Sequence, residues 1–289
     1  MSEAPAIALR DAATVMLVRD GDDGRLEVFM LRRNLRSDFV GGAYVFPGGA
    51  VDPEDRHADL EPICEGRTDA EASMVLALDP PEGGLAFWVA AIRESFEEAG
   101  VLLAYDGGGE VVDLRDPSVA ERFVRHRRAV DGGERRLSDV CAEEDLRLAV
   151  DGIHYFSHWI TPVGPPRRYD TRFFVAAAPV GQVPLHDDRE TIANCWIAPS
   201  DALARHEAGE FDLILPTIRN LDAIARFATA AEVLAAAAAL DQVPAVLPRI
   251  IGDGRGIRIV LPGDEGYDEA SHDLPLDMPL PGRPGGPAT

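Results

Sequence analysis

Lysine is absent from this chain of 289 residues, so all 28 basic side chains are arginine. They are outnumbered by 50 acidic side chains, which gives a formal net charge of −22 at pH 7. Because such a surface repels nucleic acid and anionic membranes on average, we expect neither as a partner. A small anionic ligand is compatible with this charge, since metal ions bound in a cleft reverse the local sign.

Long apolar runs are also lacking, and none approaches the roughly 18 residues needed to cross a bilayer. Residues 1–10 contain no basic stretch followed by an apolar one, so we expect no export signal. Cysteine is scarce: Cys64, Cys141 and Cys195 are widely separated and outside any paired CxxC spacing, which argues against a zinc site. A reducing cytoplasm is therefore the expected compartment.

Strand and helix patterns alternate along the chain. Two β-rich runs, 12–19 and 26–33, are joined by Gly21-Asp22-Asp23-Gly24 and predict a hairpin. Further strands are predicted at 43–46, 155–160, 171–178, 194–197 and in a late hairpin at 249–251 and 256–261. Helices are predicted at 70–78, 85–99, 118–130 and 138–149, after a cap at Ser200, from Pro216 toward Phe227, and at 230–240. The Pro/Gly-rich tail, 263–289, is expected to be mobile.

The helix predicted at 85–99 ends at Gly100 and carries an unusual acidic face. Because residues three and four positions apart share a face, Glu94, Glu97 and Glu98 gather on one side of it. These carboxylates repel one another, and they lie toward the carboxyl end, where the macrodipole disfavours negative charge. A hard cation such as Mg²⁺ or Mn²⁺ would relieve this repulsion. The helix alone leaves a solvated acidic face open as the alternative.

A glycine turn upstream favours the metal interpretation. Phe46-Pro47-Gly48-Gly49 follows a predicted strand, and its two glycines allow the backbone to approach a ligand closely and to expose a carbonyl. Asp55, six residues beyond Gly49, supplies another carboxylate.

With these features the chain resembles the Nudix hydrolases, whose box reads G-x5-E-x7-R-E-U-x-E-E-x-G-U, where U is aliphatic. The matching positions are Gly49, Arg93, Glu94, Glu97, Glu98, Gly100 and Val101. Asp55 stands where the family has Glu, Ser95 replaces an aliphatic residue, and the stretch between Asp55 and Arg93 is far longer than seven residues. An insertion at 56–86 adds a loop before the helix, so the helix itself need not move.

The split box, together with RYDTRFFVA at 168–176, is similar to the peroxisomal-type coenzyme A diphosphatase branch of the superfamily. This resemblance implies an α+β fold, an α/β/α sandwich with a mixed sheet. The domain would span 1–262, with the insertion at 56–86 and a lid-like or packing helical addition at 115–150.

The resemblance also implies roles for site residues. Glu94, Glu97 and Glu98 would bind Mg²⁺ or Mn²⁺ with a backbone carbonyl of Gly48 or Gly49. Arg93 would orient a box glutamate. Glu190 resembles the family's late glutamate, which binds metal or acts as a base, with Asp187 and Asp188 as competitors. Candidates for substrate phosphate or base contacts are Arg32, Arg33, Arg36, Arg168, Tyr169 and Arg172, with surface charge balance as the alternative for the arginines.

The expected reaction is hydrolysis of a nucleoside diphosphate linked to a second moiety. Coenzyme A or acyl-CoA is the first expectation, giving adenosine 3′,5′-bisphosphate and phosphopantetheine. ADP-ribose, NADH or a nucleotide sugar is the enzymatic alternative, and a non-catalytic Nudix-fold nucleotide sensor is the alternative of another class. Sensors commonly lose box acids, whereas this chain keeps its glutamates. Family members often form homodimers, which the resemblance leaves open here, since the sequence itself is silent on oligomeric state.

Overall fold

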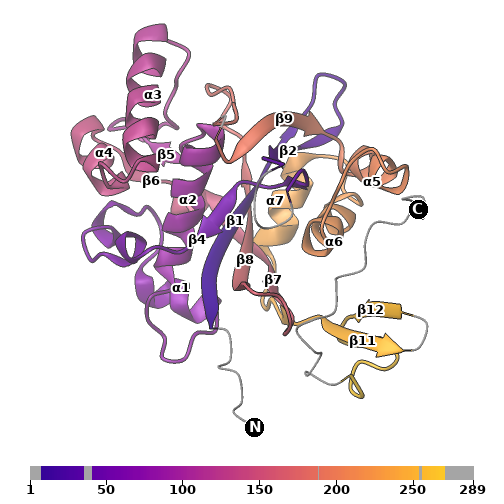
Figure 1. Cartoon of the computed structure of the whole chain (residues 1–289). Coiled ribbons are helices and arrows are strands. Elements are labelled where there is room, and N and C mark those ends of the chain that lie inside the picture. The colour runs from indigo at the N-terminus through magenta and orange to yellow at the C-terminus, as the bar shows by residue number, and fades with distance from the viewer. Residues whose placement is uncertain (1–7, 36–40, 188, 254–255, 271–289) are drawn as a thin grey trace.

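The computed structural model describes residues 8–35, 41–187, 189–253 and 256–270 (Figure 1). The candidates Arg36 and Asp188 lie outside the described residues. So does the tail from residue 271, for which mobility was expected.

An eight-stranded mixed sheet forms the centre of the molecule, with β1 (Leu9–Asp20) in its middle. β1 pairs in parallel with β8 (Arg168–Ala177) on one side. On the other side it pairs antiparallel with β4 (Gly48–Ala50) through residues 12–14 and then with β2 (Leu26–Arg33) through residues 18–20. This forked pairing places the glycine turn alongside β1.

The other strands extend the sheet or form small separate pairs. β3 (Tyr44–Val45) and β9 (Thr191–Ile197) pair with β2, β7 (Ile153–Ile160) with β8, and β10 (Ala245–Val246) with β7. Two separate pairs are formed by β5 (Ala104–Tyr105) with β6 (Arg147–Leu148) and by β11 (Arg249–Asp253) with β12 (Gly256–Val260). The predicted early and late hairpins are both confirmed.

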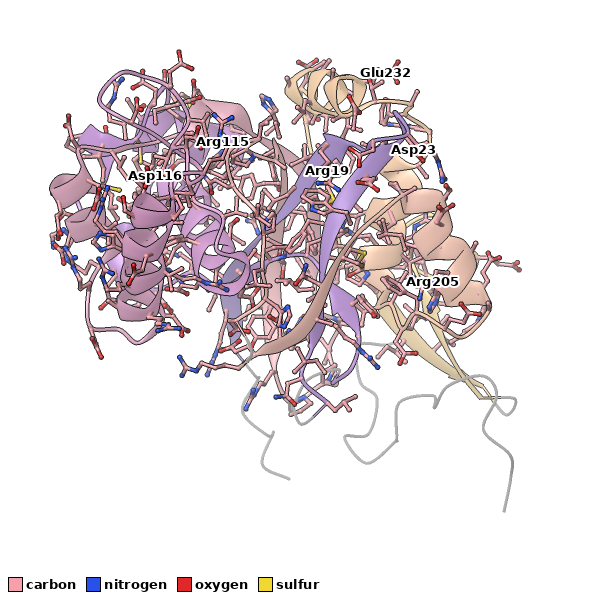
Figure 2. All side chains as sticks on the ribbon, turned by 90° about the horizontal axis from the view of Figure 1, so that it is seen from above. Arg19, Asp23, Arg115, Asp116, Arg205 and Glu232 are labelled. Carbon is pink, nitrogen blue, oxygen red and sulfur yellow. The ribbon has the colours of Figure 1, made fainter. Side chains whose placement is uncertain are left out.

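Helices cover both faces of the large sheet (Figure 1). One face carries α1 (Asp69–Val75), α2 (Leu85–Ala99), α3 (Pro117–Asp131) and α4 (Leu137–Glu144). The opposite face carries α5 (Pro199–Glu207), α6 (Leu215–Ile224) and α7 (Ala230–Ala238). Seen from above, Arg115 and Asp116 lie on the first side, and Arg205 and Glu232 on the second (Figure 2). The expected α/β/α sandwich is confirmed.

The long insertion folds back onto the start of α2. It contains the end of the short 3-10 helix η1 (Pro53–Arg56), a second one, η2 (Glu61–Ile63), and α1. Asp69 accepts hydrogen bonds from the backbone N–H groups of Gly83 and Leu85, at 2.8 and 2.9 Å. A negatively charged carboxylate at the amino end of a helix is stabilising, because that end of the macrodipole is positive. The insertion therefore supports the helix without displacing it.

Several helix boundaries differ from the predicted ones, and two of these differences have a clear physical reason. The helix predicted at 138–149 ends at Glu144, because Asp145 adopts a left-handed conformation (φ 53°) and the chain then pairs as β6. Ser200 does not cap α5: the helix begins at Pro199, with Ala198 as its N-cap. Proline suits the first helical position because its φ is already helical and its missing N–H has no partner there.

Among the described residues, no helix combines the length and apolarity needed to cross a membrane.

One buried carboxamide joins the segment after α2 to the segment after β8. The side chain of Gln182 accepts from the backbone N–H of Leu102 at 2.9 Å and donates to the carbonyls of Leu102 and Val112 at 2.9 and 3.0 Å.

Because each buried polar group left unpaired costs about 1–3 kcal/mol, we expect Gln182→Ala to lower the free energy of unfolding by roughly 3 kcal/mol. Urea denaturation measures this change. Val183→Ala, at an adjacent exposed position, is the control; equal effects of both substitutions would contradict the role of the carboxamide.

Candidate active site

A buried arginine lies at the centre of the acidic cluster. The Arg93 side chain is 9% exposed, and its Nε and Nη2 each donate to one carboxylate oxygen of Asp55 at 2.9 Å. Nη1 donates to Glu94 at 2.8 Å and to Glu97 at 2.9 Å, while Nη2 also reaches the carbonyl of Ala50 at 2.8 Å. One cation thus ties α2 to β4 and to η1.

Asp55 is held in turn by its own 3-10 helix. Its carboxylate accepts from the backbone N–H of Asp52 at 2.8 Å, and the residue is 4% exposed. Because both of its oxygens are also bonded to Arg93, Asp55 orients the guanidinium. The shorter side chain found in place of the usual Glu is sufficient for this contact.

Two glycines bring β4 against the acidic face of α2. The N–H of Gly48 donates to the Glu98 carboxylate at 2.9 Å. A Cβ at Gly49 would overlap the carboxylate of Glu94. The absence of a side chain at Gly49 is therefore a condition for the position of Glu94.

The pairing of β4 with β1 determines which glycine carbonyl is available. Flanking hydrogen bonds run from Val15 N–H to Pro47 and from Val51 N–H to Asp11, both at 2.9 Å. Bonded and non-bonded pairs alternate along an antiparallel ladder, so Gly49 bonds to β1 and the carbonyl of Gly48 points away from it. Of the two carbonyls considered as ligands, that of Gly48 is the one the ladder leaves available.

The acidic face is not solvated. The side chains of Glu94 and Glu97 are 13% and 15% exposed, and Glu98 is 7% exposed. Burial raises the pKa of Glu94 and of Glu97 to about 7 each, although Arg93 opposes the shift. Burial, and then the charge of Glu94, hold the pKa of Glu98 well above its usual range. Because neighbouring carboxylates also raise the pKa of Glu94 and of Glu98, an additional cation at this face would favour the ionised forms.

The donor set fits a hard divalent cation. The hydrogen bonds to Arg93 and to Gly48 use one oxygen each of Glu94, Glu97 and Glu98. Among the described residues, these bonds leave the second oxygen of each glutamate for another ligand. Carboxylate and carbonyl oxygens are the ligands that Mg²⁺ and Mn²⁺ prefer.

Among the described residues, the acidic group whose potential ligand atoms all lie within 4.8 Å of one another is a different one, His126 with Glu143 and Glu144. The oxygens of Glu94, Glu97 and Glu98 are spread around Arg93 and Gly48. Arg122 binds both oxygens of Glu144, at 2.6 and 2.9 Å. Arg135 contacts Glu143 at 2.8 Å and His126 at 3.1 Å. A metal ion would have to displace two guanidinium groups, so this network serves to join α3 to α4.

Two predicted residues outside the box lie within electrostatic reach of Glu98. Beyond burial, which is the main cause, the charge of Glu190 raises the pKa of Glu98 and that of Arg33 lowers it. Glu190 is exposed. Asp187 accepts hydrogen bonds from the backbone N–H groups of the three residues 189–191, so it shapes the turn that presents Glu190.

The remaining predicted substrate contacts that the structure describes, Arg32, Arg168, Tyr169 and Arg172, form hydrogen bonds or ion pairs with groups other than the glutamates. Arg32 donates to the carbonyl of Gly42 at 3.3 Å, and Arg168 to the carbonyls of Thr161 and Pro162 at 3.1 and 3.2 Å. The backbone N–H of Tyr169 donates to Thr161. Arg172 is 5% exposed, is bound to Asp170 and His158, and lies 5.1 Å from the ring centroid of Phe87, near the amino end of α2.

Residues 9–224 match the family model described as the NUDT19 Nudix domain. The chain belongs to this Nudix family. The acyl-coenzyme A diphosphatases NUDT19 of Gallus gallus and Homo sapiens are each 29% identical to it. The alignments cover 90% and 84% of this chain, and 80% and 73% of those proteins. A Nudix hydrolase structure from Alicyclobacillus acidocaldarius is 27% identical, with a TM-score of 0.64 over 79% of this chain and 96% of that one. The Arg93 cluster is therefore a Nudix box divided by an insertion.

One residue at this Nudix box was missed by the sequence reasoning. Arg127 of α3 donates from Nε to the carbonyl of Glu97 and from Nη2 to that of Glu98, both at 2.8 Å. An arginine contributed by a distant segment leaves no local pattern in the sequence. The uncompensated negative end of the helix at 85–99 was the only signal that some cation must lie there.

Removing metal should make the stability of the protein depend on pH. The pKa values of Glu94 and Glu97 are raised from 4.5 to about 7, so their stabilising contribution is complete below about pH 4.5 and is lost as the pH rises through 7. In EDTA, the free energy of unfolding should fall from pH 6 to pH 8, and Mg²⁺ should restore it most at pH 8. Urea denaturation at both pH values measures this; an equal pH dependence in Glu97→Gln would contradict it.

Proposed function

We propose that this protein is a divalent-metal-dependent diphosphatase that hydrolyses coenzyme A or acyl-CoA. Its products would be adenosine 3′,5′-bisphosphate and phosphopantetheine or the acylated form. The observation that carries this proposal is the set of three largely buried glutamates on α2, of which Arg93 holds Glu94 and Glu97 and the N–H of Gly48 holds Glu98. The substrate class is supported by the relatives named acyl-coenzyme A diphosphatase, which align with most of the chain.

In this proposal Glu94, Glu97, Glu98 and the carbonyl of Gly48 hold Mg²⁺ or Mn²⁺. When bound, the metal supplies charge neutralisation on the phosphoanhydride oxygens and a lower pKa for the attacking water. The protein's part is to fix the donors. Arg93 holds one oxygen each of Glu94 and Glu97, and the N–H of Gly48 holds Glu98, so the remaining oxygens are pre-positioned.

Glu190 and Arg33 are proposed to act on the substrate side. Glu190 is exposed within reach of Glu98, where it could accept the proton of the attacking water as a general base or add a metal ligand. Arg33 places a positive charge near the same carboxylate, where it can bind a substrate phosphate. Arg32 and Arg168 bind main-chain carbonyls through Nε, and Tyr169 bonds Thr161 through its backbone N–H, so contact with a nucleotide through the Nη groups or the Tyr169 ring is compatible with these bonds.

Location in a reducing cytoplasm accompanies this proposal as a prediction from the sequence, and a homodimer accompanies it as an assembly that is common in the family.

Incubation with Mg²⁺ or Mn²⁺ and a substrate panel tests the proposal. The panel contains coenzyme A, an acyl-CoA, ADP-ribose, NADH and nucleotide sugars, with products identified by mass spectrometry. We expect the largest kcat/KM for coenzyme A or acyl-CoA and no turnover in excess EDTA. Glu97→Gln combined with Glu98→Gln should lower kcat/KM by more than about 100-fold, since even outer partners of a metal contribute about 10–100-fold.

Glu207→Gln, at an exposed position of α5, is the matched control and should leave turnover unchanged. Turnover that survives EDTA or the double substitution would contradict the metal mechanism. A higher kcat/KM for ADP-ribose, NADH or a nucleotide sugar would reassign the substrate. Tight nucleotide binding without turnover of any compound would favour a sensor.

A further inference from the structure

The carboxyl end of α2 presents an electrostatic problem. Glu97 and Glu98 lie in the last turn, where the backbone carbonyls lack helical partners and the macrodipole is negative. Two buried carboxylates add further negative charge there. A cation at this end would both satisfy the carbonyls and offset the charge.

Arg127 of α3 supplies that cation. Its fork donates to the main-chain carbonyls of Glu97 and Glu98 at 2.8 Å each, so one side chain binds the backbone of two proposed metal ligands. Gly100, which ends α2 with φ +68°, lies against it: a Cβ there would approach Arg127 Nη1 to 2.9 Å. Gly100 therefore leaves room for the guanidinium as well as adopting the left-handed conformation.

The same helix also reaches the turn that carries Glu190. Asp131, one helical turn beyond Arg127, forms an ion pair with Arg189. Asp131 also lies close enough to Glu97 that its charge raises the pKa of that carboxylate, after burial, which is the main cause. α3 is itself anchored, because Phe123 and Val130 are buried in the apolar core beside α2.

We propose that α3 fixes the position of Glu97 and Glu98 relative to the turn that carries Glu190, and that Arg127 is a positioning residue for the reaction. We call this role of α3, through Arg127 and Asp131, the brace. The brace belongs to the helical addition, outside the Nudix box. Its catalytic consequence rests on the proposed function, whereas its effect on metal binding does not require a particular substrate. Lysine could not fully replace the guanidinium of Arg127, because a single ammonium group does not present two donors in a fixed geometry to adjacent carbonyls.

Direct Mn²⁺ binding in the absence of substrate, followed by electron paramagnetic resonance, tests this role. Arg127→Ala should weaken Mn²⁺ affinity by about 10-fold, the lower range for residues that orient metal ligands, and Arg127→Lys should have an intermediate effect. Arg128→Ala, the exposed arginine next to it on α3, should bind Mn²⁺ as the unmodified protein does. Glu98→Gln, which removes a proposed ligand, should show the largest loss.

Steady-state kinetics adds a readout that loss of stability alone would not change. With saturating Mg²⁺, Arg127→Ala should lower kcat while the substrate KM stays within about twofold, because the acids rather than the substrate contacts have moved. Asp131→Asn with Arg189→Gln should lower kcat in the same way, because the turn that carries Glu190 loses its ion pair with α3. Urea denaturation confirms that each variant is folded, and if Arg127→Ala is not, Arg127→Lys carries the test.

The outcomes distinguish a failure of the brace from a failure of the proposed function. Unchanged Mn²⁺ affinity in folded Arg127→Ala or Arg127→Lys, together with a loss in Glu98→Gln, would overturn the brace and leave the metal site standing. Unchanged affinity in Glu98→Gln as well would overturn the metal site and the proposed function. Equal losses in Arg127→Ala and Arg128→Ala would show a general charge effect and would also overturn the brace.

Discussion

Arg93 donates five hydrogen bonds from a buried position, to Asp55, Glu94, Glu97 and the carbonyl of Ala50. These bonds connect the acidic helix α2 to the strand β4 and the 3-10 helix η1, which are close to each other in the sequence and separated from α2 by the insertion. Without this cation, three carboxylates would be buried with no charged partner inside the cluster, a condition that proteins avoid because unpaired buried charge is costly. The guanidinium offsets part of the negative charge, and the remainder is what a divalent metal would neutralise.

Helix α2 is supported at both ends by segments that the Nudix box does not contain. Asp69, from the long insertion, accepts hydrogen bonds at its amino end, and Arg127, from the helical addition, donates to carbonyls at its carboxyl end. The two additions thus place charges of the favourable sign at the two poles of the macrodipole. A helix fixed in this way holds its glutamates with little freedom, which is what preorganised metal ligation requires.

Local patterns in the sequence carried the prediction of α2 and the clustering of its glutamates, because positions three and four apart share a face in any helix. The paired strands β1 and β2 followed from their alternation and from the turn between them. Contacts between distant segments could not be read in this way. The bonding of Asp55 to Arg93, the burial of Arg172 beneath α2 and the reach of Arg127 all depend on how the sheet and its additions pack. The early end of α4 likewise depends on the pairing of the following segment, β6, with β5.

The central claim is that the buried acids of α2, oriented by Arg93, form a site for a divalent cation. Anomalous diffraction from crystals grown with Mn²⁺ locates the ion directly. We predict a peak bounded by carboxylate oxygens of Glu94, Glu97 and Glu98 and by the carbonyl of Gly48. A peak at His126 and Glu144 instead would contradict the account. So would the absence of a peak between the three glutamates in crystals at saturating Mn²⁺.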